Sequence, residues 1–264
     1  MLRRMFLRSS LLGTVLAMGV TAQAQAQQLT VGANIGNVPW EFQDESGNIV
    51  GFEIDVVNEI GARLGREVVI ENIPFNGLFS AVQSGRIDMA TSSITITPER
   101  LQEVSFAQPY YDSDQSLTVT AESGLGGLSD MSGKVIGVDT GSTGDMWATE
   151  HEAEYGFAEI RRFEGLAPAM LDLVNGGIDG YISDIPALQY YAQDKPEILV
   201  AERIPTGERY SIMFAKDAPL AAEVDAVITE LKNDGFMAAT HEKWFGAAPE
   251  DTTSTVQVMD MPAP

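Results

Sequence analysis

The sequence predicts an α/β protein whose sheets are covered by helices on both faces, a doubly wound arrangement. Short apolar strands alternate with segments of helical periodicity along most of the chain. A length of 264 residues allows two lobes of roughly 100–130 residues each. The halves also echo one another, because at residues 84–88 and 175–179 a helix ends at glycine and a strand begins with Ile-Asp.

The first half of the chain is predicted to supply three strands and two helices. In order, these are strand 29–33, helix 51–64, strand 68–73, a short helix from 76 to 85, and strand 87–91. In the longer helix Val56, Ile60 and Leu64 recur at i, i+4 and i+8, and Gly65 ends it. We expect Asn76 to cap the shorter helix.

The second half repeats this plan. The predicted elements are strand 134–138, helix 145–154, helix 167–174, strand 178–182, strand 209–215 and helix 220–233. The last helix carries one apolar face that includes Val224, Ile228 and Leu231, as ordinary core packing requires. The tail at 247–264 is rich in Pro, Thr and Asp, and we expect it to be mobile.

The composition excludes several classes of protein. There is no Cys, so disulfides, thiolate metal sites and cysteine nucleophiles are all absent. His151 and His241 lack metal-ligand spacing, so we expect neither a metal nor a cofactor. With 44% apolar and 20% charged residues, the chain can bury a sizeable core.

Residues 1–26 have the pattern of a secretory signal peptide. Arg3, Arg4 and Arg8 precede an apolar run at 11–20, and an A-x-A cleavage pattern ends at Ala26. An uncleaved anchor is the alternative, although the run is about half the ~20 residues that span a bilayer. Without this segment the net charge of −22 becomes −25, which disfavours binding to nucleic acid or anionic lipid.

Several motifs in the mature chain follow an order seen in a known family. They are residues 39–42 (PWEF), 51–55 (GFEID), 93–100 (SITITPER), 106–111 (FAQPYY), 141–143 (GST), Asp184 and 243–246 (KWFG). The chain resembles, over residues 29–246, the polar amino-acid-binding branch of the bacterial extracellular solute-binding proteins, which are receptors of ABC importers.

The resemblance implies two α/β lobes joined by two crossover strands, the fold of periplasmic binding proteins. Lobe one would take residues 28–117 plus 212–246, and lobe two residues 118–211. Ligand would bind in the cleft between them and close the hinge. We expect a monomeric periplasmic receptor that has an inner-membrane permease as its partner, and no enzyme. No cysteine follows the signal segment to carry a lipid, as expected for a Gram-negative periplasm.

Arg100 is the expected partner of the amino acid's carboxylate, because a guanidinium fork meets both oxygens in plane. Thr97 can cap a helix that has Pro98 at its first position, which places Arg100 in the first turn. An exposed surface arginine is the alternative.

Two further groups are expected to hold the ligand's polar head. Ser93 and Thr95 lie at alternate positions of an extended segment, so both hydroxyls face one side unless they are simply solvated. Ser142 and Thr143 lie at a helix start, where main-chain N–H groups favour an anion. This turn could instead merely cap the helix.

The resemblance also assigns roles to Asp184 and Phe75. Asp184 would bind the α-ammonium, although it precedes Pro186 and could equally cap a helix. Phe75 would form a wall beside the ligand's side chain, with core packing as the competing interpretation.

Selectivity depends on Asn34, which stands where relatives that prefer cations carry aspartate. Replacing a carboxylate by an amide removes a counter-charge, so we expect a neutral, polar side chain on the ligand. Asn37 stands where an aromatic residue often stacks, and the acids Glu41 and Asp145 could still support a cationic ligand.

Three alternatives stay open. The same fold hosts periplasmic dehydratases, in which Asp184 would be the general acid. Such lobes also occur as sensor modules, although the polar tail provides no membrane helix. A compatible-solute zwitterion would keep the carboxylate for Arg100 but lack a primary ammonium for Asp184.

Overall fold

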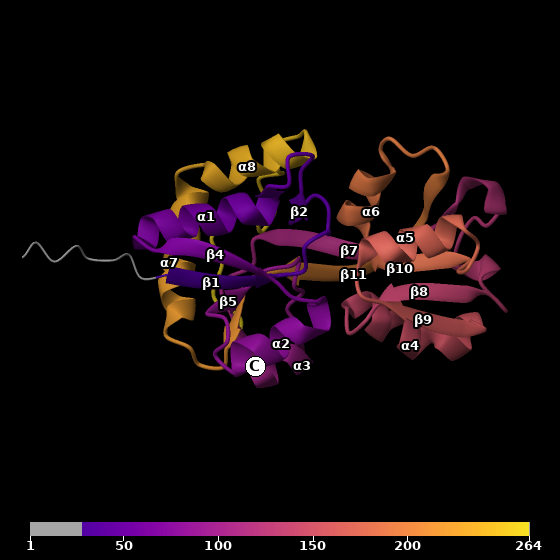
Figure 1. Cartoon of the computed structure of the whole chain (residues 1–264), viewed down its shortest axis with the longest axis horizontal. Coiled ribbons are helices and arrows are strands. Elements are labelled where there is room, and N and C mark those ends of the chain that lie inside the picture. Colours follow the sequence, from indigo (N-terminus) through magenta and orange to yellow (C-terminus); the bar gives the residue numbers. More distant parts are fainter. Residues whose placement is uncertain (1–27, 264) are drawn as a thin grey trace, which may run out of the picture.

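The computed structural model describes residues 28–263, which form two five-stranded sheets, one on each side of Figure 1. The predicted signal segment lies outside the described residues. The first sheet has the order β4 (Glu67–Asn72), β1 (Gln28–Ala33), β5 (Met89–Ala90), β12 (Met213–Ala215), β6 (Val104–Phe106). The second has the order β11 (Ile198–Tyr210), β7 (Tyr111–Thr120), β10 (Gly180–Asp184), β8 (Val135–Asp139), β9 (Glu159–Phe163). A small hairpin pairs β2 (Phe42–Gln43) with β3 (Ile49–Val50).

Helices cover both faces of each sheet, which confirms the predicted doubly wound α/β class. On the first sheet α1 (Phe52–Leu64), α7 (Leu220–Asn233) and α8 (Phe236–Phe245) build one core, and α2 (Phe75–Gln83) and α3 (Pro98–Glu103) build the other. On the second sheet α4 (Thr143–Tyr155) lies on one face, and α5 (Leu166–Val174) and α6 (Ile185–Ala192) lie on the opposite face. We call the two halves lobe one and lobe two.

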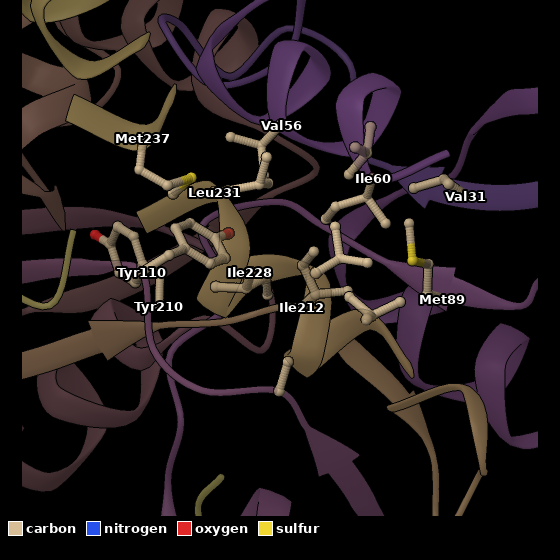
Figure 2. Packing of buried hydrophobic residues seen from close by; sticks show 14 of the residues in the cluster. Val31, Val56, Ile60, Met89, Tyr110, Tyr210, Ile212, Ile228, Leu231 and Met237 are labelled. Atoms are coloured by element: carbon tan, nitrogen blue, oxygen red, sulfur yellow. The ribbon is translucent and has the colours of Figure 1, made fainter. Parts of the chain in front are cut away.

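The largest core joins the first sheet to helices α1, α7 and α8. Figure 2 shows Ile60 of α1, Met89 of β5 and Ile228 of α7 among the side chains of this core, and all three are fully buried. Apolar side chains three or four residues apart share one face of a helix, which lets α1 and α7 both bury a stripe here. This core packs α1 and α7 against the first sheet of lobe one.

Glycines and apolar periodicity in the sequence predicted most helix ends correctly. Gly65 adopts φ 66°, and its N–H bonds back to the carbonyl of Ala62, so α1 ends where predicted. α7 spans Leu220–Asn233, which confirms the predicted range. The predicted cap at Asn76 is wrong: Pro74 holds an extended ψ of 143° and α2 begins at Phe75, so Asn76 lies inside the helix.

Two long strands, β7 and β11, connect the lobes and pair antiparallel, with Tyr111 opposite Tyr210. The second sheet therefore begins before residue 118, where the sequence predicts lobe two to start. The sequence also predicts one strand at 209–215, which the structure divides between β11 and β12. Most of β11 escaped prediction because register shifts at 200/202 and 204/208 break its alternation of apolar and polar residues.

The C-terminal tail packs on lobe one, although the sequence predicts a mobile segment. Ser254 and Thr255 are buried, and the Ser254 N–H donates to Asp112 Oδ2 at 2.7 Å. The carbonyl of Gln257 accepts from the buried Lys232 at 2.9 Å. Polar groups of the lobe thus satisfy the tail's own peptide groups, which composition alone could not reveal.

Candidate functional site

A pocket of about 440 Å³, its open mouth included, lies between the lobes. It lies where strands of both sheets end, the usual ligand position in open α/β sheets. All eight residues that the sequence predicts for ligand binding line it: Asn34, Phe75, Ser93, Thr95, Arg100, Ser142, Thr143 and Asp184. The remaining lining residues are Asn37, Ser92, Asp139, Leu166 and Ser183.

Arg100 enters the pocket from the first turn of α3. Thr97 caps this helix by accepting from the Arg100 N–H at 3.2 Å, and Pro98 opens it, as predicted. The guanidinium is not on the surface, since only 5% of the residue is exposed. Burial lowers the pKa of Arg100 to about 10, so it remains charged at neutral pH.

The guanidinium of Arg100 is held by carbonyl oxygens and aromatic rings. Nη1 donates to the Thr95 carbonyl at 2.7 Å, and Nη2 donates to the Gly141 carbonyl of lobe two at 3.1 Å. The rings of Phe75 and Phe79 lie 5.5 and 5.1 Å from its central carbon. Phe75 is therefore both a pocket wall and a packing partner of Arg100. In the described part of the chain Arg100 has no carboxylate partner within ion-pair distance.

Asp184 lines the pocket from lobe two. Its backbone caps α6, but the carboxylate makes no cap bond and accepts instead from Gln115 Nε2 at 2.5 Å and Ser93 Oγ at 3.2 Å. Burial, and next the charge of Glu208, raise the pKa of Asp184 to about 8. The capping alternative thus accounts for the backbone of Asp184 but not for its side chain.

Ser93 reaches the pocket by a different local geometry from the one predicted. It adopts φ 44°, a left-handed conformation, and is not part of an extended segment. The Glu53 carboxylate accepts the Ser93 N–H at 2.8 Å and holds this turn. The Ser93 hydroxyl accepts from Asn37 at 3.1 Å and donates to Asp184, which joins the lobes across the cleft.

Glu208 is a central residue that sequence reasoning missed. Its carboxylate accepts from the hydroxyls of Thr95 at 2.6 Å and Thr143 at 3.0 Å, and from Gln115 Nε2 at 3.0 Å. Gln115, on β7, was also missed. Both lie within crossover strands, where no motif marks a functional position.

The Gly-Ser-Thr turn both caps α4 and lines the pocket. The Ser142 hydroxyl accepts from the Asp145 N–H at 3.1 Å, which is the capping role left open by the sequence. Because the Thr143 hydroxyl is used by Glu208, the group it can offer is its main-chain N–H, which has no partner within its own helix.

The pocket lining also includes Asn34 from lobe one and Asp139 and Leu166 from lobe two. Asp139 was not predicted, although an acid that ends a strand just before the Gly-Ser-Thr turn was a usable signal. Its carboxylate oxygen Oδ1 is buried without a hydrogen-bond partner.

The two acids that might have supported a cationic ligand are used elsewhere. Asp145 pairs with Arg162 at 2.8 Å and accepts the Gly141 N–H at 3.1 Å. Glu41 is fully buried, and burial, then the neighbouring Glu53, hold its pKa well above the usual range. Burial thus disfavours the charged form of Glu41 that a cationic ligand would need.

Within residues 28–263 no group of three or more potential ligand side chains could hold a metal ion. Nor is any helix in that range long and apolar enough to cross a membrane.

Comparison with known proteins places this geometry in a family. The profile of the bacterial extracellular solute-binding proteins, family 3, matches residues 29–247. The arginine-binding extracellular protein ArtP of Bacillus subtilis is 27% identical over 227 residues, which cover 85% of this chain and 88% of ArtP.

Solved structures show the same fold. The arginine-, lysine-, histidine-binding protein ArtJ of Geobacillus stearothermophilus superposes with a TM-score of 0.78 at 32% identity, covering 85% of this chain and 98% of that one. An ancestral arginine-binding protein bound to glutamine gives 0.78 at 30% identity, covering 84% and 100%. These relatives are binding proteins and not enzymes, which removes the support for a dehydratase. The two-lobed chain therefore belongs to the bacterial extracellular solute-binding proteins of family 3.

Proposed function

We propose that this protein is the periplasmic receptor of an amino-acid ABC importer. It captures a free L-amino acid between its lobes as a monomer and delivers it to a permease in the inner membrane. The family match and the amino-acid-binding relatives support this role.

The observation that carries the proposal is that a guanidinium, that of Arg100, and a carboxyl group, that of Asp184, line the same pocket. Burial lowers the pKa of Arg100, and the charges of Glu208 and then Asp184 oppose this effect. A free amino acid carries the complementary pair, a carboxylate and an ammonium on one carbon. Arg100 and the Thr143 N–H bind the carboxylate, and Asp184 binds the ammonium.

Ligand binding favours the closed cleft because these groups come from different lobes. Arg100 belongs to lobe one, whereas Thr143 and Asp184 belong to lobe two. A ligand that contacts all three gains its full interaction energy only when the lobes meet, so it shifts the hinge toward closure.

The side chain of the ligand extends past Phe75 toward Asn34 and Asn37. These two amide groups belong to lobe one. They favour a polar side chain on the ligand and, if no other group contributes, a neutral one, as the sequence predicts. Relatives are described with arginine, lysine or histidine and with bound glutamine, so similar folds accept both cationic and neutral polar side chains.

Isothermal titration calorimetry of the mature, ligand-stripped chain with L-amino acids tests the proposal. We expect at least one of them to bind, and Arg100→Ala to weaken that binding at least about 30-fold, because it removes one partner of a desolvated charge pair. Arg86→Ala is the control, since Arg86 lies outside the pocket and pairs at the surface with Glu71 at 2.8 Å.

Unchanged affinity in Arg100→Ala would contradict the carboxylate assignment. Binding of a quaternary-ammonium compatible solute in place of every amino acid would show that the ligand class is wrong. The control should bind like the wild type, because Arg86 lies outside the pocket. Its loss should also leave the fold intact, since an exposed ion pair contributes at most about 1 kcal/mol to stability.

A further inference from the structure

Asp139 ends β8 with its side chain in the pocket, and its carboxylate is incompletely satisfied. It lines the pocket beside Leu166, and Oδ1 is buried without a hydrogen-bond partner. Across residues 28–263, no Lys, Arg or His nitrogen lies within ion-pair distance of it. A buried carboxylate without a cation is costly, so a site that keeps one has a use for it.

Asp139 and Asn34 line the pocket from opposite lobes, and both lie near Gly165. The Gly165 N–H donates to Asp139, and a methyl group placed on Gly165 would lie 3.6 Å from Asn34 Nδ2. Gly165 therefore lies between the two side chains, and its lack of a side chain leaves that space open. Arg100 and Asp184, which we assign to the amino-acid head group, line the same pocket.

The charges in the pocket indicate which group lacks a partner. An amino acid's carboxylate and ammonium balance Arg100 and Asp184 one for one. Within the described residues Glu208 has no cation either, but it accepts hydrogen bonds from four neutral donors, the hydroxyls of Thr95, Thr143 and Thr206 and the amide of Gln115. Asp139 is left over. Burial raises its pKa to about 6, against the opposing effects of the Tyr181 hydroxyl and the Gly165 N–H, so it is largely ionised at pH 7.

We infer that Asp139 is a specificity-determining residue that selects amino acids whose side chain ends in a cationic nitrogen donor, with Asn34 as a neutral partner across the cleft. This inference rests on the proposed function. It places the counter-charge on lobe two and thereby reverses the neutral preference that Asn34 alone would give. A guanidinium or ammonium group supplies the missing positive charge and can donate to Oδ1.

L-arginine and L-citrulline form a matched pair of probes, since they have the same length and differ in charge at the side-chain end. We expect the wild type to bind arginine at least about 10-fold more tightly than citrulline by calorimetry. In Asp139→Asn the affinity for arginine should fall about 10- to 100-fold, whereas that for citrulline should change less than about 3-fold. Asp172→Asn is the control, because Asp172 lies on α5 outside the pocket and pairs with Arg161 at 2.9 Å.

Citrulline or glutamine binding to Asp139→Asn also reports that the variant is folded. If the wild type binds arginine no better than citrulline, or if Asp139→Asn keeps the wild-type ratio, the inference is overturned and the receptor function stands. If the wild type binds no amino acid at all, the proposed function fails together with the inference.

Discussion

At the scale of single residues, Asp184 meets two opposing demands. It is buried, which favours the neutral acid, yet it must be ionised to bind an ammonium. Its pKa is raised to about 8 in the folded protein from an ordinary value of 3.8, so the unfolded chain ionises first as pH rises. The contribution of Asp184 to stability is therefore present below about pH 4 and is lost as pH rises toward about 8.

The Asp184→Asn variant should thus be more stable than the ligand-free wild type at pH 8, by on the order of 1–3 kcal/mol, and this advantage should disappear near pH 4. The same variant should bind amino acids at least about 30-fold more weakly. Urea unfolding of both proteins at the two pH values measures the difference. An equal stability difference at pH 4 and pH 8 would show that the carboxyl group is not held in its neutral form.

At the scale of elements, α3 is short, and its cap positions a binding residue. The Thr97 hydroxyl accepts the N–H of Arg100, whose guanidinium then crosses to lobe two. Pro98 presets the first turn, so the direction of Arg100 depends on how the helix begins.

Thr97→Ala should cost about 1 kcal/mol of stability, because the Arg100 N–H loses its acceptor. Fraying of this turn should also weaken ligand binding, by roughly 3- to 10-fold on the same energy scale. Thr97→Ser keeps the acceptor and should behave like the wild type in both denaturant unfolding and calorimetry. A serine variant as weak as the alanine variant would instead assign the effect to packing of the threonine methyl group.

At the scale of the whole molecule, the C-terminal tail adds to lobe one without entering the pocket. Lys232 is buried and donates to Gln108 Oε1 at 2.8 Å and to the carbonyls of Pro109 and Gln257 at 2.7 and 2.9 Å. Burial lowers the pKa of Lys232 to about 8, so the cation depends on all three acceptors. The tail also contacts Asp112 near the start of the crossover strand β7.

Ending the chain after Gly246 should lower stability by roughly 1–3 kcal/mol, since the Lys232 ammonium and the Asp112 carboxylate each lose a partner. Amino-acid affinity should change less than about 3-fold, because no pocket residue is removed. Differential scanning calorimetry and ligand titration measure the two effects. Val258→Ala, at a side chain that is 48% exposed, is the control and should match the wild type. A truncated chain with an unchanged melting temperature would show that these contacts contribute little.

Much of the pocket could be predicted from sequence because its residues adjoin strong local signals. Arg100 follows a Thr-Pro helix start, Thr143 begins a helix after Gly141, and Asp184 ends a strand. Gln115 and Glu208 could not be found in this way. They meet only because β7 and β11 pair antiparallel across a long stretch of sequence, and register between distant strands is not encoded in a local motif.

The sequence by itself determined the α/β class, the principal helices and the family, since periodicity, caps and ordered motifs are local properties of the chain. Only the tertiary structure decided which charges face the ligand. Burial disfavours the charged form of Glu41, and Arg162 pairs with Asp145. In the part of the chain that the structure describes, Asp139 lines the pocket without a cationic partner. The balance of charges in the pocket depends on which side chains the fold brings together and how deeply it buries them.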